Sequence, residues 1–400
     1  MALHSYADAI ARNLTLGSVE ILYIKRLIMR NFRIFAYLDM AFPPGITVIY
    51  GDNAQGKTTI IEAIALALTG ESPRTSQERE ILKIGEKFAV SRAFVKLENS
   101  EEHQLEVILT NGKKTWSIDG KARKRGEEGW APFHIVCFLP QEIQIVSGEP
   151  RNRRDFLDKV ISHWSYSYHF NLLNYRRVVS QRNALLEVIN EQKVSEKDAK
   201  ERISHWDAQI LKYGVKVIET RLEFMMRWQN FVCDVFKELG GEGEIKMRYI
   251  SSLGDDLESF YLTKREALIE RYAQLLAKSL PYDIESTATS VGPHRDDFQV
   301  LVNGIDIRDY GSFGQQKLVI LALKLSLGRM HQNERKISSI ILLDDALSQL
   351  DVKRRHMLLE HAKKYEQCII TTTTIYDVPK SFWNSCSLFM AKGGEVIKAK

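Results

Sequence analysis

The sequence predicts an α/β fold in which a helical arm is inserted into a head made from two separate parts of the chain. Short strand-like segments and apolar helices occupy residues 21–150 and 281–400. Residues 151–280 contain no proline and are rich in Arg, Glu, Gln, Leu and aromatic residues, which favours long helices. A glycine-rich loop in the first part has a matching acidic strand in the second, so we expect the two parts to form one site.

Length and composition predict a globular chain in a reducing compartment. Its 400 residues exceed one ordinary domain, and 44% apolar with 27% charged residues can build a core. The four cysteines lie far apart without a C-x-x-C pair, which argues against zinc and against disulfides. No apolar run approaches the about 20 residues that span a membrane. We expect a cytoplasmic protein without membrane contact, whose net charge of +5 permits a polyanionic partner but does not establish one.

The first part of the head begins with strands. Residues 21–50 predict three short strands, with a Pro-Pro-Gly turn before the last. Residues 59–69 are apolar around most of a helix, as a buried helix would be. Alternating segments between 88 and 120 predict antiparallel strands with Asn111-Gly112 as a hairpin turn, and 133–140 predicts another strand.

Helices dominate the middle of the chain, and strands return after it. Long helices are predicted at 174–192 and 206–239. Strands follow at 298–308, 338–346 and 367–374, with a helix that opens on "SFGQQ" after the first of them. These elements divide the chain into an extension of unknown role (1–20), the first part of the head (21–150), a helical arm (151–280) and the second part of the head (281–400).

The stretch "GDNAQGKTT" fits the phosphate-binding pattern G-x-x-x-x-G-K-[ST] between a strand and a helix. Its residues are candidate ATP ligands: Gly51, Asp52, Asn53, Ala54, Gln55, Gly56, Lys57, Thr58 and Thr59. In this pattern the backbone N–H groups surround the phosphates, Lys57 reaches the β- and γ-phosphates, and the Thr58 hydroxyl binds Mg²⁺. The alternative is a chance match in a glycine turn.

An acidic pair follows the apolar run "SSIILL" and supplies the expected second half of the site. Asp344 is suited to hold Mg²⁺ through a water molecule, and Asp345 to orient the attacking water. The alternative is that both acids cap a following helix.

The "SFGQQ" stretch places small and amide side chains at a helix start. Ser312, Gly314 and Gln315 would offer neutral donors to a phosphate bound by another chain, so that each ATP lies between two copies of a head-to-tail homodimer. The alternative is that Ser312 only caps its helix. The order of phosphate loop, S-x-G-Q-Q and acidic strand is similar to the ABC-type P-loop ATPase head, a mixed sheet with helices plus an antiparallel β subdomain.

The chain resembles the RecF recombination-repair family, compact relatives of the SMC-type ATPases. The resemblance runs from about residue 22 to the C-terminus, and its most specific parts occur in combination. They are "RNFR", "GDNAQGKT", "TGESPRTS", "GEPRNRRDFLD", "NYRRVVSQRNALL", "GPHRDDF", "FGQQKLVILALKL", "LLDDALSQLD" and "CIITTTT".

The resemblance implies further roles. Gln141 begins a nucleotide-sensing loop and is a candidate catalytic residue beside Asp345 and Lys57, while Arg33 lies at the edge where relatives contact the nucleotide. Ser348 and Asp351 belong to a loop that crosses the dimer seam. The family implies a slow, DNA-stimulated ATPase that dimerises on ATP and clamps double-stranded DNA near single-strand gaps. The resemblance also implies RecR- and RecO-type partners that help to load RecA.

Four departures from the family pattern concern fine regulation. Lys317 stands where the family usually has Arg, and Gln349 where it usually has Glu. Pro73 replaces a usual His, and Gln141-Glu142 replace a Glu-Asp pair.

The segment "KKTWSIDGKARKR" is a candidate DNA contact. A basic hairpin with an interleaved aromatic, Trp116, would suit phosphate contacts whose affinity falls with salt. A solvated hairpin edge is the equal alternative. The six basic candidates are Lys113, Lys114, Lys121, Arg123, Lys124 and Arg125.

Three other functions fit the sequence less well. A transporter nucleotide-binding subunit would carry a His where this chain has "TTTT" at 371–374, and it would lack the arm. An SMC-type structural protein would need sustained heptads, which the arm does not show. An ATPase-coupled nuclease would need a separate acidic metal-binding domain, which we do not find in the sequence.

Overall fold

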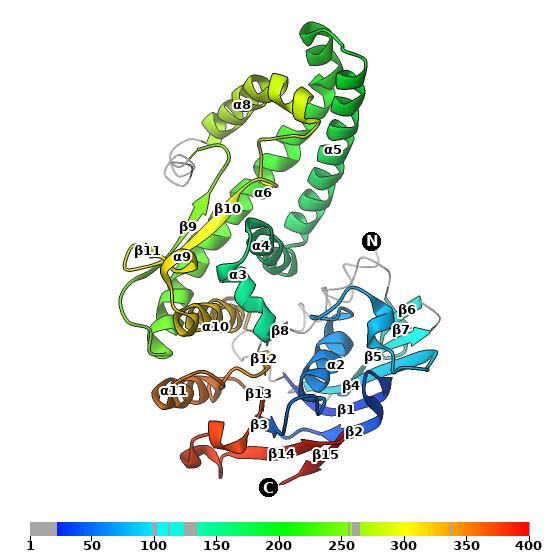
Figure 1. Cartoon of the computed structure of the whole chain (residues 1–400), viewed down its shortest axis with the longest axis vertical. Helices are drawn as coiled ribbons and strands as arrows, with labels where there is room; N and C mark the ends of the chain where they lie inside the picture. Colours follow the sequence, from blue (N-terminus) through cyan, green and yellow to red (C-terminus); the bar gives the residue numbers. More distant parts are fainter. Residues whose placement is uncertain are drawn as a thin grey trace. The chain divides into compact units, whose positions relative to one another are not determined.

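A computed structural model describes residues 22–97, 102–110, 113–123, 134–254, 257, 265–336 and 338–399. The chain forms two compact units (Figure 1). The head unit comprises Met1–Glu142, Asp234–Glu242 and Phe313–Lys400, and the arm unit comprises Ile143–Cys233 and Gly243–Ser312. Within the described residues, no helix combines the length and apolar character needed to cross a membrane.

The head unit contains a mixed sheet with the strand order β15-β14-β3-β13-β12-β8. Its neighbouring strands are parallel except for β15, which is antiparallel to β14. The central strands β12 and β13 are buried along their whole length, as expected for parallel strands covered on both faces. The bounds are β3 Gly45–Tyr50, β8 His134–Phe138, β12 Ser339–Leu343, β13 Gln367–Thr372, β14 Cys386–Lys392 and β15 Glu395–Lys398.

A second sheet of the head unit is antiparallel, with the order β2-β1-β4-β5-β6-β7. The predicted strands before the phosphate loop and between 88 and 120 are therefore confirmed. Strands β5 and β6 pair up to Thr110 and Lys113, and the predicted Asn111-Gly112 turn lies outside the described residues. The bounds are β1 Leu22–Phe32, β2 Phe35–Ala41, β4 Phe88–Leu97, β5 Glu102–Thr110, β6 Lys113–Ile118 and β7 Lys121–Ala122.

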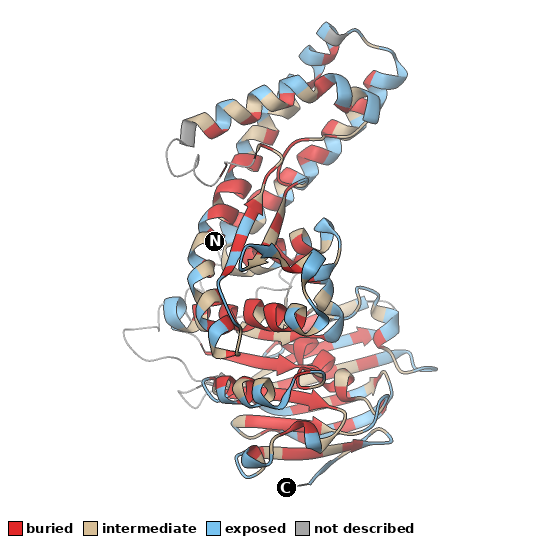
Figure 2. Cartoon of the chain, turned by 60° about the vertical axis from the view of Figure 1, so that its left-hand side comes forward, coloured by how far each residue is buried: buried red, intermediate tan, exposed pale blue. Residues whose placement is uncertain are grey.

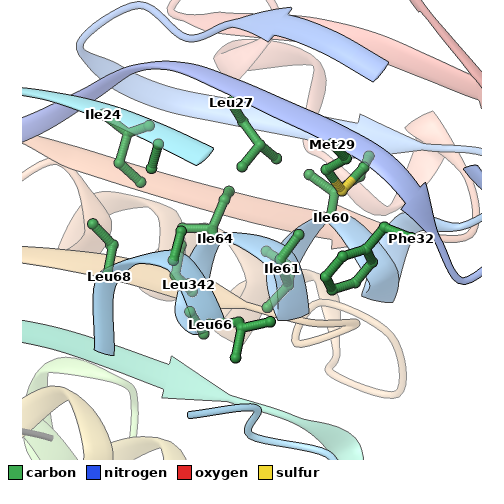
Figure 3. Close-up of a cluster of buried hydrophobic side chains, with 14 of the residues drawn as sticks. Ile24, Leu27, Met29, Phe32, Ile60, Ile61, Ile64, Leu66, Leu68 and Leu342 are labelled. Carbon is green, nitrogen blue, oxygen red and sulfur yellow. The ribbon is translucent and has the colours of Figure 1, made fainter. Parts of the chain in front are cut away.

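Helix α2 (Lys57–Thr69) packs against both sheets and forms the main core of the head unit (Figure 3). Ile60, Ile61 and Ile64 are fully buried against β1 residues such as Leu27. Burial of side chains of this size contributes roughly 1.5–3 kcal/mol each. The core thus fixes the start of α2, where the phosphate loop ends. The head unit also contains α10 (Phe313–Met330) and α11 (Val352–Ala362).

The arm unit consists of long helices with a small three-stranded sheet. The long helices are predicted correctly, but a strand at Ile245–Ile250 (β9) interrupts the region expected to be helical. In Figure 2 the helices of this unit carry buried and exposed faces. The other bounds are α3 Gln144–Ser147, α4 Pro150–Trp164, α5 Tyr166–Glu191, α6 Glu196–Glu238, α8 Arg265–Ser286, β10 Asp297–Val302, β11 Ile305–Asp306 and α9 Ile307–Tyr310.

The boundary between the units differs from the predicted one. Residues 281–312, which were expected in the head, group with the arm unit. Pairing explains the difference, because β10 is antiparallel to β9 along its whole length. The guanidinium of Arg153 on α4 also donates to both carboxylate oxygens of Asp297, at 2.7 and 2.8 Å.

Residues of the "QRN" and "GPHRDD" motifs make buried hydrogen bonds inside the arm unit. Arg182 is fully buried and donates to Asp283 at 2.7 Å and to Thr289 at 3.0 Å. Asp296 accepts from the Tyr249 hydroxyl at 2.7 Å and from the Ser252 backbone N–H at 2.7 Å. Buried charges are tolerated when paired and hydrogen-bonded in this way. These motifs therefore hold the arm unit together.

Candidate nucleotide-binding site

The phosphate loop connects β3 to α2, as its pattern predicts. At Gly51 a Cβ atom would lie 2.2 Å from the carbonyl oxygen of Ala391, so only glycine fits. Gly56 has φ +93°, and a Cβ there would lie 2.6 Å from the Phe35 ring. Both glycines are therefore required by the backbone path. Asp52, Asn53 and Ala54 are exposed and Thr59 is buried; the remaining loop residues Gly51, Gln55, Gly56 and Thr58 have intermediate exposure.

Lys57 at the first position of α2 points back over the loop. Its Nζ donates to the carbonyl oxygens of Gly51 and Asp52, both at 2.7 Å. Burial lowers the pKa of Lys57, and the charges of Asp344 and Asp345 oppose that effect. The ammonium group thus lies between the loop and both predicted acids, where an incoming phosphate would meet it.

Asp344 lies beside the phosphate loop, as predicted. The Thr58 hydroxyl donates to its Oδ1 and Oδ2 atoms at 2.9 and 2.8 Å, and the Thr371 hydroxyl donates to Oδ1 at 2.5 Å. Burial raises the pKa of Asp344, while the hydrogen bonds from Thr371 and Thr58 act in the opposite direction. Strand pairing explains why Asp344 and Thr371 lie close together, because β12 and β13 are parallel neighbours whose carboxyl ends lie at one sheet edge.

This oxygen set fits Mg²⁺, which prefers hard oxygen ligands and retains several waters. A hydroxyl and a carboxylate on neighbouring elements leave the other coordination positions to water and phosphate. Thr58 and Asp344 are therefore the residues that would hold the ion, either directly or through water. When bound there, Mg²⁺ would supply positive charge that neutralises the charge developing on the phosphate groups.

Asp345 adopts a left-handed backbone conformation with φ +49°. Its backbone N–H donates to Thr371 at the carbonyl oxygen and at the hydroxyl, both at 3.1 Å. Its Oδ2 accepts from the Ser348 hydroxyl at 2.7 Å, whereas its Oδ1 is buried without a hydrogen-bond partner in the described part of the chain. A buried carboxylate oxygen without a partner favours a role in holding a water or ligand.

Glu62 is a functional candidate that the sequence reasoning missed. It is fully buried on α2, and its carboxylate accepts from Arg33 at 2.6 and 2.8 Å, from Arg74 at 3.1 Å and from Ser72 at 2.7 Å. The sequence feature that could have indicated Glu62 is its position as a lone acid within an apolar helix, because a buried acid needs partners. The structure thus pairs Arg33 with Glu62, and nucleotide contact by Arg33 stays a prediction.

The "SFGQQ" stretch lies at the start of α10, as predicted. Ser312 and Gln315 are exposed, Gly314 has intermediate exposure, and the Phe313 side chain is 54% exposed. An apolar ring left in solvent beside small and amide groups is consistent with a surface that another molecule covers. The contact with a second chain stays a prediction.

The other residues carried over from the resemblance lie on loops that follow buried strands. Gln141 is exposed on the 3-10 turn Pro140–Ile143, after β8. Ser348 bonds to Asp345, as described above. The Asp351 side chain caps α11 by accepting from the Arg354 backbone N–H at 2.9 Å. A catalytic role for Gln141 and a dimer role for Ser348 and Asp351 remain predictions.

The candidate DNA contacts are only partly brought together. Lys113 and Lys121 are exposed, and Lys114 and Arg123 have intermediate exposure on β6 and after β7. Lys124 and Arg125 lie outside the described residues. The interpretation of Trp116 as an accessible aromatic is wrong. It is 3% exposed and donates from Nε1 to the Ala67 carbonyl at 3.0 Å, because it packs on α2 as part of the core.

Comparisons with known proteins agree with this geometry. A family model described as an AAA domain matches residues 26–279. The DNA replication and repair protein RecF of Clostridium acetobutylicum is 33% identical over 384 residues, covering 94% of this chain and 100% of that protein. The chain belongs to the RecF family. RecF of Lachnoclostridium phytofermentans is 35% identical over 352 residues, covering 88% of this chain and 92% of its own length.

Solved structures support the same assignment. The recombination mediator protein RecF of the RecFOR pathway, in its RecF-ATPrS form, has a TM-score of 0.82 at 31% identity, covering 96% of this chain and 100% of that one. Its RecF-ATP form has a TM-score of 0.79 at 31% identity, covering 95% and 99%. The Smc head domain from Pyrococcus furiosus, at 16% identity and TM-score 0.53 with 95% and 97% coverage, shares the fold alone. The predicted α/β head with an inserted helical arm is confirmed.

Proposed function

We propose that this RecF-family chain is an ATP-dependent, DNA-binding recombination mediator. ATP and Mg²⁺ bind at the phosphate loop and bring two copies together as a homodimer. The dimer clamps duplex DNA near single-strand gaps and, with RecO- and RecR-type partners, helps to load RecA. Hydrolysis is slow, is stimulated by DNA and serves to release the clamp.

The observation that carries the proposal is the convergence on Asp344. Thr58 from the phosphate loop and Thr371 from the end of β13 both donate to its carboxylate, with Lys57 and Asp345 beside it. A hydroxyl, an ammonium and two acids in this arrangement are the parts that phosphoryl transfer uses. The RecF-ATP structure named above, which matches along nearly the whole chain, supports ATP as the ligand.

The composition of the "SFGQQ" stretch supports the proposed homodimer. The exposed start of α10, with Ser312, Gly314 and Gln315, offers donors to a phosphate held by another copy. The exposed side chains of Phe313 and Val352, the latter 73% exposed beside Asp351, would be covered in that contact. Such contact would exclude water from the γ-phosphate, which strengthens every electrostatic interaction there.

The test is duplex DNA binding with and without ATP, measured by fluorescence anisotropy, beside ATP-dependent dimerisation measured by light scattering. Wild type should dimerise and bind a gapped duplex only with ATP and Mg²⁺. Lys57→Ala, which removes the charge facing the phosphates, should lose both responses. Equal DNA binding by wild type with and without ATP would refute the ATP-controlled clamp.

A further inference from the structure

Two lysines on α10 lie among apolar neighbours and two turns apart, on one face of the helix. Lys317 is 5% exposed, and the Lys324 side chain is 11% exposed. Seven residues correspond to about two helical turns, so both project from the same side. Because burial of an ammonium group is unfavourable unless it is hydrogen-bonded, each lysine is expected to hold specific partners.

Lys317 holds the turn that follows β12. Its Nζ donates to the carbonyl oxygen of Asp345 at 3.0 Å and to that of Ser348 at 2.6 Å. The Ser348 hydroxyl in turn donates to the Asp345 carboxylate at 2.7 Å. The ammonium therefore clamps both ends of the turn that carries Asp345, whose left-handed backbone would otherwise be unfavourable for a residue with a side chain.

Lys324 holds the loop that follows β8. Its Nζ donates to the carbonyl oxygen of Cys137 at 2.9 Å and to Glu142 Oε1 at 2.5 Å. The other carboxylate oxygen of Glu142 accepts from the Leu139 backbone N–H at 2.9 Å. Cys137 and Leu139 precede Gln141 in the sequence, and Glu142 follows it. The contacts of Lys324 therefore restrain the backbone on both sides of Gln141.

The two loops leave the same edge of the sheet, because β8 and β12 are parallel neighbours and pair Phe138 with Leu343. One helix thus holds both loops from one face, and the same helix begins with the "SFGQQ" stretch. A displacement of α10 would move both loops together, since a packed helix moves as a rigid element.

We propose that Lys317 and Lys324 are positioning residues through which α10 sets the Asp345 and Gln141 loops of its own chain. Docking of the start of α10 on the nucleotide of a second copy would then adjust the hydrolysis machinery around the chain's own nucleotide. This proposal deepens the proposed function and rests on it. Lys324 acts through its contact with Glu142, which stands where the family usually has Asp. Lys317 acts through its contacts with the carbonyl oxygens of Asp345 and Ser348.

The test uses the full chain with Lys317→Met, Lys324→Met and Lys317→Arg. Arg329→Met is the matched control, because Arg329 lies on the same helix but pairs with Glu238 at 2.8 Å and not with either loop. Lys317→Met should slow single-turnover hydrolysis at least about tenfold, since small displacements of a positioned group cost rate steeply. Monomer affinity for a fluorescent ATP analogue should stay within about twofold of wild type, because the phosphate contacts themselves are retained.

Lys317→Arg should recover most of the rate, because a guanidinium can also donate to two carbonyls. Arg329→Met should hydrolyse ATP as wild type does. If Lys317→Met turns over at the wild-type rate while Lys57→Ala is inactive, the inference fails and the proposed function stands. If Lys317→Met loses ATP binding together with rate, and Lys317→Arg does not restore them, the lysine is a structural residue and the inference fails.

A second measurement does not depend on hydrolysis. In nucleotide-free protein, amide hydrogen exchange should accelerate at residues 345–350 in Lys317→Met and at residues 139–142 in Lys324→Met, and at neither loop in Arg329→Met. Unchanged exchange at both loops in both variants would show that the two lysines do not position these loops. Faster exchange at these loops in the two variants than in wild type would support the role of the lysines, and absence of ATP turnover by wild type in the same experiments would reject the proposed function.

Discussion

The Thr58 hydroxyl donates to both carboxylate oxygens of Asp344, a residue 286 positions further along the chain, at 2.9 and 2.8 Å. This pair joins the start of α2 to the end of β12. In the nucleotide-bound protein the same two side chains are suited to hold Mg²⁺. The relationship leads directly to a prediction about metal removal.

Thr58→Ala should remove the metal dependence of ATP binding. In wild type, chelation of Mg²⁺ by EDTA should weaken ATP affinity at least about tenfold, because the ion neutralises phosphate charge. Thr58→Ala should bind ATP weakly and equally with and without EDTA, while Thr58→Ser, which keeps the hydroxyl, should respond as wild type does. Equilibrium binding of a fluorescent ATP analogue measures this, and an EDTA response retained by Thr58→Ala would exclude Thr58 as a ligand.

Ser312→Arg should abolish ATP-induced dimers while leaving ATP binding by the monomer intact. The residue is exposed at the start of α10, so the larger side chain is tolerated in one copy but would clash with a second copy. Light scattering with and without ATP measures dimerisation. Full dimerisation of the variant would show that Ser312 does not face a second chain.

Asp345→Asn should trap the ATP dimer. The buried Oδ1 is available to orient a water, and an amide cannot supply the same acceptor pair. Hydrolysis should fall at least about a hundredfold, with ATP binding retained because Asp344 would still be available to hold the metal. ABC-type heads generally have Glu at this position, and the shorter Asp should already make wild-type turnover slow. Single-turnover hydrolysis and dimer lifetime test this together, and an unchanged lifetime would remove Asp345 from the catalytic role.

Hydrolysis should depend on the charge of Lys317. The pKa of Lys317 is lowered to about 8, because burial, together with the charge of Arg355, outweighs the opposing effect of Asp345 and Asp377. The ammonium is therefore present below about pH 8 and is lost as pH rises through that value. The wild-type rate divided by the Lys317→Arg rate should fall between about pH 7 and pH 9, because a guanidinium stays charged throughout. A constant ratio across this range would show that the charge has no role.

Acid should destabilise the head unit through Glu238. Burial raises the pKa of Glu238, but hydrogen bonds from Lys364 and Arg329 outweigh this effect and hold it at about 2. The folded value lies below the ordinary value of 4.5, so this stabilisation is present above pH 4.5 and is lost as pH falls towards 2. Glu238→Gln should lower the unfolding free energy at pH 7 by about 1–2 kcal/mol after solvent screening. Between pH 4.5 and pH 2, the unfolding free energy measured in urea should fall less for Glu238→Gln than for wild type. An equal fall in both proteins would show that Glu238 does not cause the acid destabilisation.

Several parts of the site could be predicted because local patterns determine them. The phosphate loop requires glycine at positions 51 and 56, and a buried parallel strand that ends in two acids brings Asp344 to the same sheet edge. Each pattern consists of one strand and the few residues that directly follow it, so it can be recognised without knowing which strands are neighbours.

Other parts depend on which strands become neighbours, and the sequence does not encode that order locally. Thr371 contacts both acids only because β13 lies between β3 and β12. The strand β9 alternates in burial, but its partner β10 comes after α8, so the segment was assigned to the helical region. The burial of Trp116 could not be predicted, since a strand's outer and inner faces cannot be distinguished before its packing on α2 is known.

The strand order of the head unit also constrains how the protein is made. Among the strands that the structure describes, β3, which leads into the phosphate loop, pairs with β13 and β14 from the last part of the chain. During synthesis at about 5–20 residues per second, β3 waits on the order of tens of seconds for these partners to leave the ribosome. The antiparallel sheet and the arm unit use partners that emerge earlier, so both can fold first. A chain truncated after the arm unit would leave the apolar strand β3 without these partners, and unpaired strand edges promote aggregation.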